Sequence, residues 1–69
     1  MHKYLVVFEK AGANFSAYSP DLPGCIATGS TRREVGQNIR EAIRLHVEGL
    51  VQDGAPLPEQ IAFTEYVEV

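Results

Sequence analysis

The stretch that decides the fold reads YSPDLPGCIATGSTRREV and spans residues 18–35. Its centre is a proline–glycine pair, Pro23-Gly24. Proline presets a negative φ and glycine accepts a positive φ, so this pair suits the two central positions of a type II turn. The stretch therefore predicts a fixed turn that leads into a short strand and then into a helix.

The residues around this pair have a structural interpretation and a chemical one. Pro20 stiffens the entry to the turn. The carboxylate of Asp21 can accept the backbone N–H of Gly24 or Cys25, as turn aspartates do. This structural role needs no ligand and is our first interpretation, and a role for Asp21 as a metal ligand or an acid is the alternative.

A helix is predicted to follow the stretch. Thr31 and Glu34 fit a capping box, in which the hydroxyl accepts the Glu34 N–H and the carboxylate reaches back to the Thr31 N–H. The predicted helix spans about Arg32 to Asp53, and Gly54 supplies a left-handed cap after it. One face is apolar at helical spacing. Its residues are Val35, Ile39, Ala42, Ile43 and Leu50.

Four segments read as strands because they are rich in β-branched and aromatic residues or alternate in polarity. Gly12 and Asn14 mark the turn between the first two. The predicted strands are Lys3–Phe8, Phe15–Tyr18, Cys25–Gly29 and Ile61–Val69.

The resulting order is β-β-β-α-β, which predicts an α+β fold in a single domain over residues 1–69. The first three strands form an antiparallel meander. A right-handed crossover through the helix should bring the last strand beside the first and parallel to it. The helix covers one sheet face, yet the first strand is apolar on both sides. We therefore expect something outside the chain to cover the second face.

Composition restricts the function further. The chain has 69 residues, one cysteine, two histidines and a net charge of −3, with six Lys and Arg against nine Asp and Glu. An internal disulfide is impossible, and the Cys and His positions match no zinc spacing, so no metal or cofactor is expected. The acidic balance argues against nucleic acid as the main ligand. No apolar run is long enough to span a membrane, and no signal peptide is visible, so a cytoplasmic location is expected.

Small domains without disulfides or metals usually depend on a partner. A homodimer or a larger homo-oligomer is therefore expected. Catalysis by a Cys25–His46 pair is the less favoured alternative, because His46 falls on the core face of the helix and a small buried thiol is the more common role for such a cysteine.

The motifs resemble those of HicB-type antitoxins. The resemblance rests on Pro20-Asp21-Leu22-Pro23-Gly24-Cys25, on Gly29 with Thr31, and on Glu34, Asn38, Glu41-Ala42-Ile43 and Pro58. It extends roughly from residue 3 to residue 58. The chain departs from the usual pattern at the helix start, which reads GSTRRE, and at Gly36, near a position that the family usually fills with alanine.

The resemblance implies a truncated ribonuclease H-like fold and a partner, a HicA-type toxin that cleaves mRNA. It implies that the chain binds and blocks this toxin without catalysis. Many family members add a C-terminal DNA-binding domain, which the sequence does not show, so DNA binding by this chain alone is not expected. A stand-alone oligomeric scaffold or regulator is the main alternative function. A degenerate nuclease is the third and least favoured function. Two-metal nucleases need several carboxylates close together, and the spacing of the acids in the predicted strands and helix does not bring them together.

The contact surface for a basic partner can be proposed from the helix and the last strand. Acidic residues are available to meet positive charge, and apolar residues beside the core face are available as anchors. The candidates are Leu45, Val47, Glu48, Val51, Glu65 and Glu68, with Glu41 as a further acid.

Overall fold

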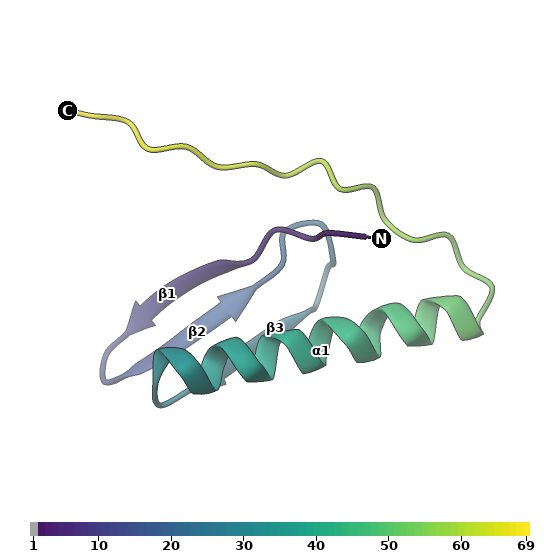
Figure 1. Ribbon diagram of the computed structural model, residues 1–69, viewed down its shortest axis with the longest axis horizontal. Helices are drawn as coiled ribbons and strands as arrows, with labels where there is room; N and C mark the ends of the chain where they lie inside the picture. Colours follow the sequence, from purple (N-terminus) through teal and green to yellow (C-terminus); the bar gives the residue numbers. More distant parts are fainter. Residues whose placement is uncertain (1) are drawn as a thin grey trace.

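The computed structural model describes residues 2–69, which form a three-stranded sheet followed by one helix (Figure 1). The elements are β1 (Val7–Ala11), β2 (Asn14–Tyr18), β3 (Ile26–Gly29) and α1 (Arg32–Gln52). The strand order is β1-β2-β3, and both neighbouring pairs are antiparallel. The predicted α+β class and the antiparallel meander are confirmed.

The first strand begins later than predicted. We expected Lys3–Phe8, whereas β1 spans Val7–Ala11 and pairs with β2 from Val7 opposite Tyr18 to Ala11 opposite Asn14. The two-residue loop between them starts with Gly12 at φ 63°, as hairpin loops with a leading glycine require. Pairing sets the strand bounds, so the apolar residues before Val7 remain outside the ladder because β2 ends at Tyr18.

Helix α1 has the predicted bounds to within one residue. The Thr31 side chain caps its start, and Asp53 is the residue that caps its end. Gly54 follows with φ 69°, and the Ala55 N–H donates to the Leu50 carbonyl at 2.9 Å. This is the left-handed termination that glycine permits at low cost.

The core lies between α1 and the sheet. The helix packs against β3 and β2. The buried cluster consists of Ala17, Leu22, Cys25, Val35 and Ile39, with Tyr4, Val6, Phe15, Ala27, Ala42, Ile43 and Val47 partly buried around it. The predicted apolar face of the helix is thus confirmed over its first turns, while Leu50 is half-buried and lies outside the cluster.

A close approach of backbones joins β3 to the helix. A Cβ added to Gly29 would lie 2.6 Å from the backbone nitrogen of Val35. Real Cβ atoms do not come so near to backbone atoms, so only glycine lets the strand end meet the first turn of α1 at this distance. Val35 is fully buried as a result of this packing.

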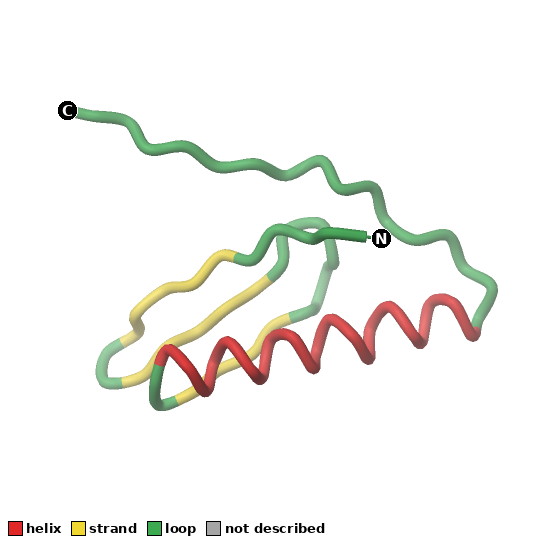
Figure 2. Tube along the Cα trace, in the orientation of Figure 1, coloured by secondary structure: helices red, strands yellow, loops and turns green. Residues whose placement is uncertain are grey.

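The predicted fourth strand is wrong. Residues 55–69 are extended, but they form no strand, and the sheet ends at β1 (Figure 2). We call residues 61–69 the C-terminal arm. Alternating polarity predicts an extended backbone, but a strand also needs a hydrogen-bonding neighbour. In this conformation the arm runs past the sheet and away from it (Figure 1).

The sheet face away from α1 carries a row of apolar side chains. Ala17 is buried toward the helix, so its neighbour Tyr18 points to the opposite face. Tyr18 pairs with Val7 on one side and with Ile26 on the other, and Ile26 is 64% exposed.

In residues 2–69 no helix is long and apolar enough to cross a membrane.

Candidate functional site

The proline–glycine turn has the predicted geometry. The Cys25 N–H donates to the Leu22 carbonyl at 3.0 Å, which closes a turn with Pro23 and Gly24 at its centre. Gly24 has φ 81°, the positive value that a type II turn requires at its third position. The turn inserts Leu22 into the core, where its side chain is fully buried. It therefore shapes the core as well as reversing the chain.

The partner of Asp21 differs from the prediction. Instead of accepting the Gly24 or Cys25 N–H, its carboxylate accepts the backbone N–H of Ala62, with oxygen–nitrogen distances of 3.2 and 3.1 Å. The Cys25 N–H is already used by the Leu22 carbonyl. Pro20, beside Asp21, is exposed. Within residues 2–69, no three His, Cys, Asp or Glu side chains are grouped so that they could hold a metal ion.

Cys25 is a buried free thiol next to this turn. Its side chain is 5% exposed, and burial raises the pKa of the thiol above its ordinary value. The thiolate is the nucleophilic form of cysteine, so a raised pKa makes the group a poor nucleophile at neutral pH. His46 lies half-buried on α1. The geometry at Cys25 is that of a packing residue.

The helix start is held by a modified capping box. The Thr31 hydroxyl accepts the Glu34 N–H at 3.0 Å, as predicted. The Glu34 carboxylate does not reach the Thr31 N–H, and instead it accepts the N–H and the hydroxyl of Ser30, each at 3.1 Å. Ser30 is one residue further out, so the carboxylate clamps the β3–α1 connection.

Asn38 has a role that the sequence did not reveal. Its side-chain amide donates to the Thr28 carbonyl at 2.8 Å and so joins α1 to β3. The residue belongs to the motif that carries the family resemblance, and its spacing from Glu34 placed it one turn further along the helix. Its partner on a strand could be identified only from the packed structure.

Three of the proposed partner-binding residues lie together near the end of α1. Leu45 and Val51 are 55% and 61% exposed, although both are apolar. Glu48 lies between them along the chain and accepts a hydrogen bond from Arg44 at 2.8 Å. Val47, the fourth candidate on this helix, packs against the core cluster instead. The exposed part of this group is therefore an acidic position flanked by two apolar side chains.

The acids of this helix are partly compensated by their own chain. Arg44 bonds both Glu41 and Glu48. The hydrogen bond from Arg44 is the main cause that lowers the pKa of Glu41, and the two carboxylates together raise the pKa of Arg44. The three side chains are exposed, so water screens their attraction and the network adds little stability. They still present one net negative charge on this face.

The remaining two candidates, Glu65 and Glu68, lie on the C-terminal arm and are exposed. Figure 1 places the tip of the arm at the opposite end of the molecule from the last turn of α1. The six proposed residues thus form two separate groups, one on the helix and one on the arm.

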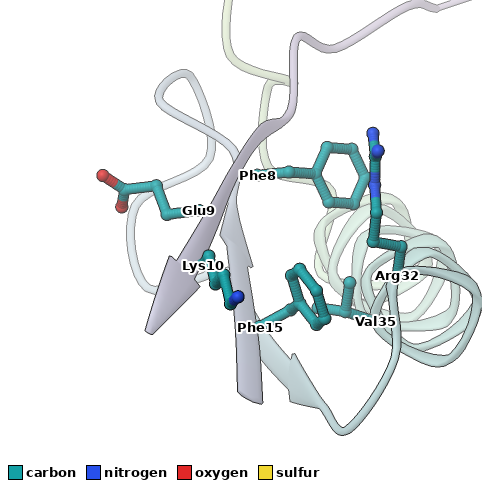
Figure 3. A pocket seen from close by; sticks show the side chains of 6 residues that line it. All are labelled: Phe8, Glu9, Lys10, Phe15, Arg32 and Val35. Carbon is teal, nitrogen blue, oxygen red and sulfur yellow. The ribbon is translucent and has the colours of Figure 1, made fainter. Parts of the chain in front are cut away.

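A groove that the sequence analysis missed opens beside β1 (Figure 3). It has a volume of about 330 Å³. Phe8, Phe15 and Val35 form its apolar walls, and Lys10 and Arg32 bring positive charge to it. Phe8 is 51% exposed, which is unusual for a phenylalanine next to a core. The sequence offered one signal, since Phe8 continues the alternation that places Val6 against the core.

Comparisons with known proteins identify a family and several relatives. The model for the HicB-like antitoxin of bacterial toxin–antitoxin systems matches residues 4–68. An uncharacterised 14.9 kDa protein of Haemophilus phage HP1 is 34% identical over 93% of this chain. A UPF0150 protein of Synechocystis is 38% identical over 87% of this chain and 77% of its own length.

A solved structure is also similar. A chain of a HicA3 and HicB3 toxin–antitoxin complex superimposes with a TM-score of 0.67 and 36% identity over 80% of this chain. The present chain spans 48% of the phage protein and 64% of that solved chain.

Proposed function

Because the chain belongs to the HicB-like antitoxin family of bacterial toxin–antitoxin systems, we propose that it binds and neutralises a HicA-type toxin, a small basic ribonuclease that cleaves mRNA. The observation that carries this proposal is the similarity, in both fold and sequence, to a chain of a HicA3 and HicB3 complex. Residues 1–69 would act as a single antitoxin domain.

The charge of the chain supports a basic partner. Its net charge is −3, and opposite charge on a partner accelerates association. On α1, the exposed Leu45 and Val51 flank Glu48, which gives apolar anchors beside a negative charge. Interfaces usually gain most of their affinity from a few such anchors, while rim charges mainly set the association rate. We therefore place the toxin contact on the end of α1.

The same features support binding without catalysis. The cysteine is buried, with a raised thiol pKa, and on α1 Arg44 engages Glu41 and Glu48 while Ser30 engages Glu34. In this proposal the chain inhibits by covering the toxin's active surface, and it acts in the cytoplasm, where mRNA is found. DNA binding is not part of the proposed role of this domain, given its acidic balance.

The test is co-expression with a HicA-type toxin from the same genome, scored by growth and by mRNA cleavage. We expect rescue of growth and loss of cleavage, and co-purification of the two proteins. Growth arrest that persists despite stable antitoxin would overturn the proposal. RNA cleavage by the purified chain alone would instead favour the nuclease alternative.

A further inference from the structure

The C-terminal arm has the pattern of a strand without a sheet. Ile61, Phe63 and Val67 are 70%, 82% and 77% exposed. They share one side of an extended backbone, while Thr64 and Glu68 share the other. Alternation of this kind is typical of a strand that buries one side. Within the described residues these three side chains are not buried. Burial of this side of the arm would therefore require contact with another chain.

Strand β1 has the complementary property of a sheet edge without a neighbour. It pairs with β2 on one side only, so its other edge offers unpaired N–H and C=O groups. Among residues 2–69, α1 packs on β2 and β3 but not on β1. This leaves Phe8 half-exposed at the groove with Phe15 and Val35 (Figure 3).

The charges of the two elements also match. Lys10 and Arg32 line the groove, and neither forms an ion pair within the described residues, where the ion pairs found all involve Arg44. The arm contributes Glu65, which shares the side of Phe63 and Val67, and it contains no lysine or arginine. An apolar and acidic strand is thus available for an apolar and basic groove.

The arm is anchored at its base in a way that directs the rest outward. The Tyr4 hydroxyl donates to the Pro58 carbonyl at 2.8 Å, and the Lys3 N–H donates to the Gln60 side chain at 2.9 Å. Asp21 then holds the N–H of Ala62. Beyond this point the arm leaves its own sheet and projects past β1 (Figure 1). The proline-containing connection before it favours this extended form.

We propose that two copies of this chain exchange their C-terminal arms. Each arm pairs with the free edge of β1 in the other copy and buries Phe63 and Val67 at the groove beside Phe8. A twofold arrangement makes both contacts at once and pairs the free edge of β1 in each copy, so the assembly closes at two copies. A second copy is the occupant that the structure favours because one chain supplies both halves of the contact. The exchange does not depend on the toxin.

The first test uses sedimentation equilibrium on the full chain. We expect a dimer at micromolar concentration. Phe63→Asp should weaken dimerisation by roughly tenfold or more. The matched control Thr64→Asp places the same charge on the other side of the arm and should leave the dimer intact. Circular dichroism should show that both variants are folded, because the core cluster contains no arm residue.

The second test distinguishes exchange from other dimers. Phe8→Asp damages the acceptor edge and Phe63→Asp damages the donor arm, so each variant alone should dimerise weakly. A mixture of the two retains one undamaged contact and should form a mixed dimer more tightly than either variant alone.

Three results would overturn the proposal. They are a monomeric wild-type chain at high micromolar concentration, an unchanged dimer in Phe63→Asp, and a mixture that dimerises no better than its components. If Phe63→Asp instead kept the dimer and lost toxin binding, the arm would dock on the toxin. Failure of antitoxin activity with a normal exchange pattern would refute only the proposed function.

Discussion

The carboxylate of Asp21, in the turn before β3, accepts the backbone N–H of Ala62, which lies 41 residues further along the chain. This contact ties the proline–glycine turn to the base of the C-terminal arm. The turn motif therefore has two structural tasks: it places Leu22 in the core and it fixes the point where the arm departs.

Removal of this carboxylate should free the base of the arm. We expect Asp21→Ala to accelerate hydrogen exchange at the Ala62 amide and to lower the free energy of unfolding by about 1 kcal/mol, because one partly buried hydrogen bond is lost. Asp21→Asn keeps an oxygen acceptor and should change both quantities less. Unchanged protection of Ala62 in the alanine variant would contradict the assignment, and a metal-dependent activity abolished in the asparagine variant would support the alternative role.

Gly24 should resist substitution because of its backbone alone. Its φ is 81°, and beyond its two chain neighbours no atom of the described residues lies within 4 Å of an added Cβ. Gly24→Ala should therefore lower the free energy of unfolding by more than about 1 kcal/mol through conformational strain, without any clash. Gly49→Ala is the control, because this helical glycine also has open space around it. Gly49→Ala should raise the free energy of unfolding by up to about 1 kcal/mol. Urea or thermal unfolding of both variants decides the matter.

Gly29 and Gly36 form a second matched pair, in which the local packing decides whether a change to alanine raises or lowers the free energy of unfolding. Gly29→Ala would place a Cβ 2.6 Å from the Val35 nitrogen and should destabilise by about 2–3 kcal/mol. Gly36→Ala would meet only the flexible end of Arg40 at 3.6 Å and should stabilise by up to about 1 kcal/mol. Equal unfolding midpoints for the two variants would show that the contact between β3 and α1 has room for a side chain at position 29.

The end of α1 should control toxin binding. Leu45→Asp and Val51→Asp each put a charge in place of an exposed apolar side chain, and we expect both to release the toxin by raising the dissociation rate. Glu48→Gln should mainly slow association and reduce its salt dependence. Interferometry with the purified toxin at two salt concentrations measures both rates. Full affinity in the two aspartate variants would move the contact away from this helix.

Cys25 should behave as a buried, inert thiol. We expect slow alkylation of the native chain and rapid alkylation after unfolding. Burial raises the thiol pKa, so the folded chain holds this proton more tightly than the unfolded chain does. The free energy of unfolding should accordingly fall as the pH rises past the ordinary thiol pKa of 9.0. This part of the decline should be absent in Cys25→Ser.

The same cysteine also allows a test of function. Cys25→Ser and His46→Gln should leave toxin neutralisation intact as long as the variants remain folded. A folded variant that no longer protects cells would give one of these side chains a direct role.

Local signals in the sequence were sufficient for the meander and the helix. Thr31 and Glu34 predicted the helix start, and Gly54 predicted its end, because each effect acts over a few residues of one chain segment. The Pro23-Gly24 turn was equally local. The motif around it also carried the family resemblance that the comparisons bear out.

Contacts between distant segments were decided only by the tertiary structure. The sequence predicted an extended backbone for residues 61–69, but whether that backbone pairs with β1 depends on the position of both elements. The pairing of Asp21 with Ala62 and the need for glycine at position 29 have the same origin. A residue's polarity and propensity limit its local conformation, whereas its partner depends on which distant atoms the whole fold brings within hydrogen-bonding or van der Waals range.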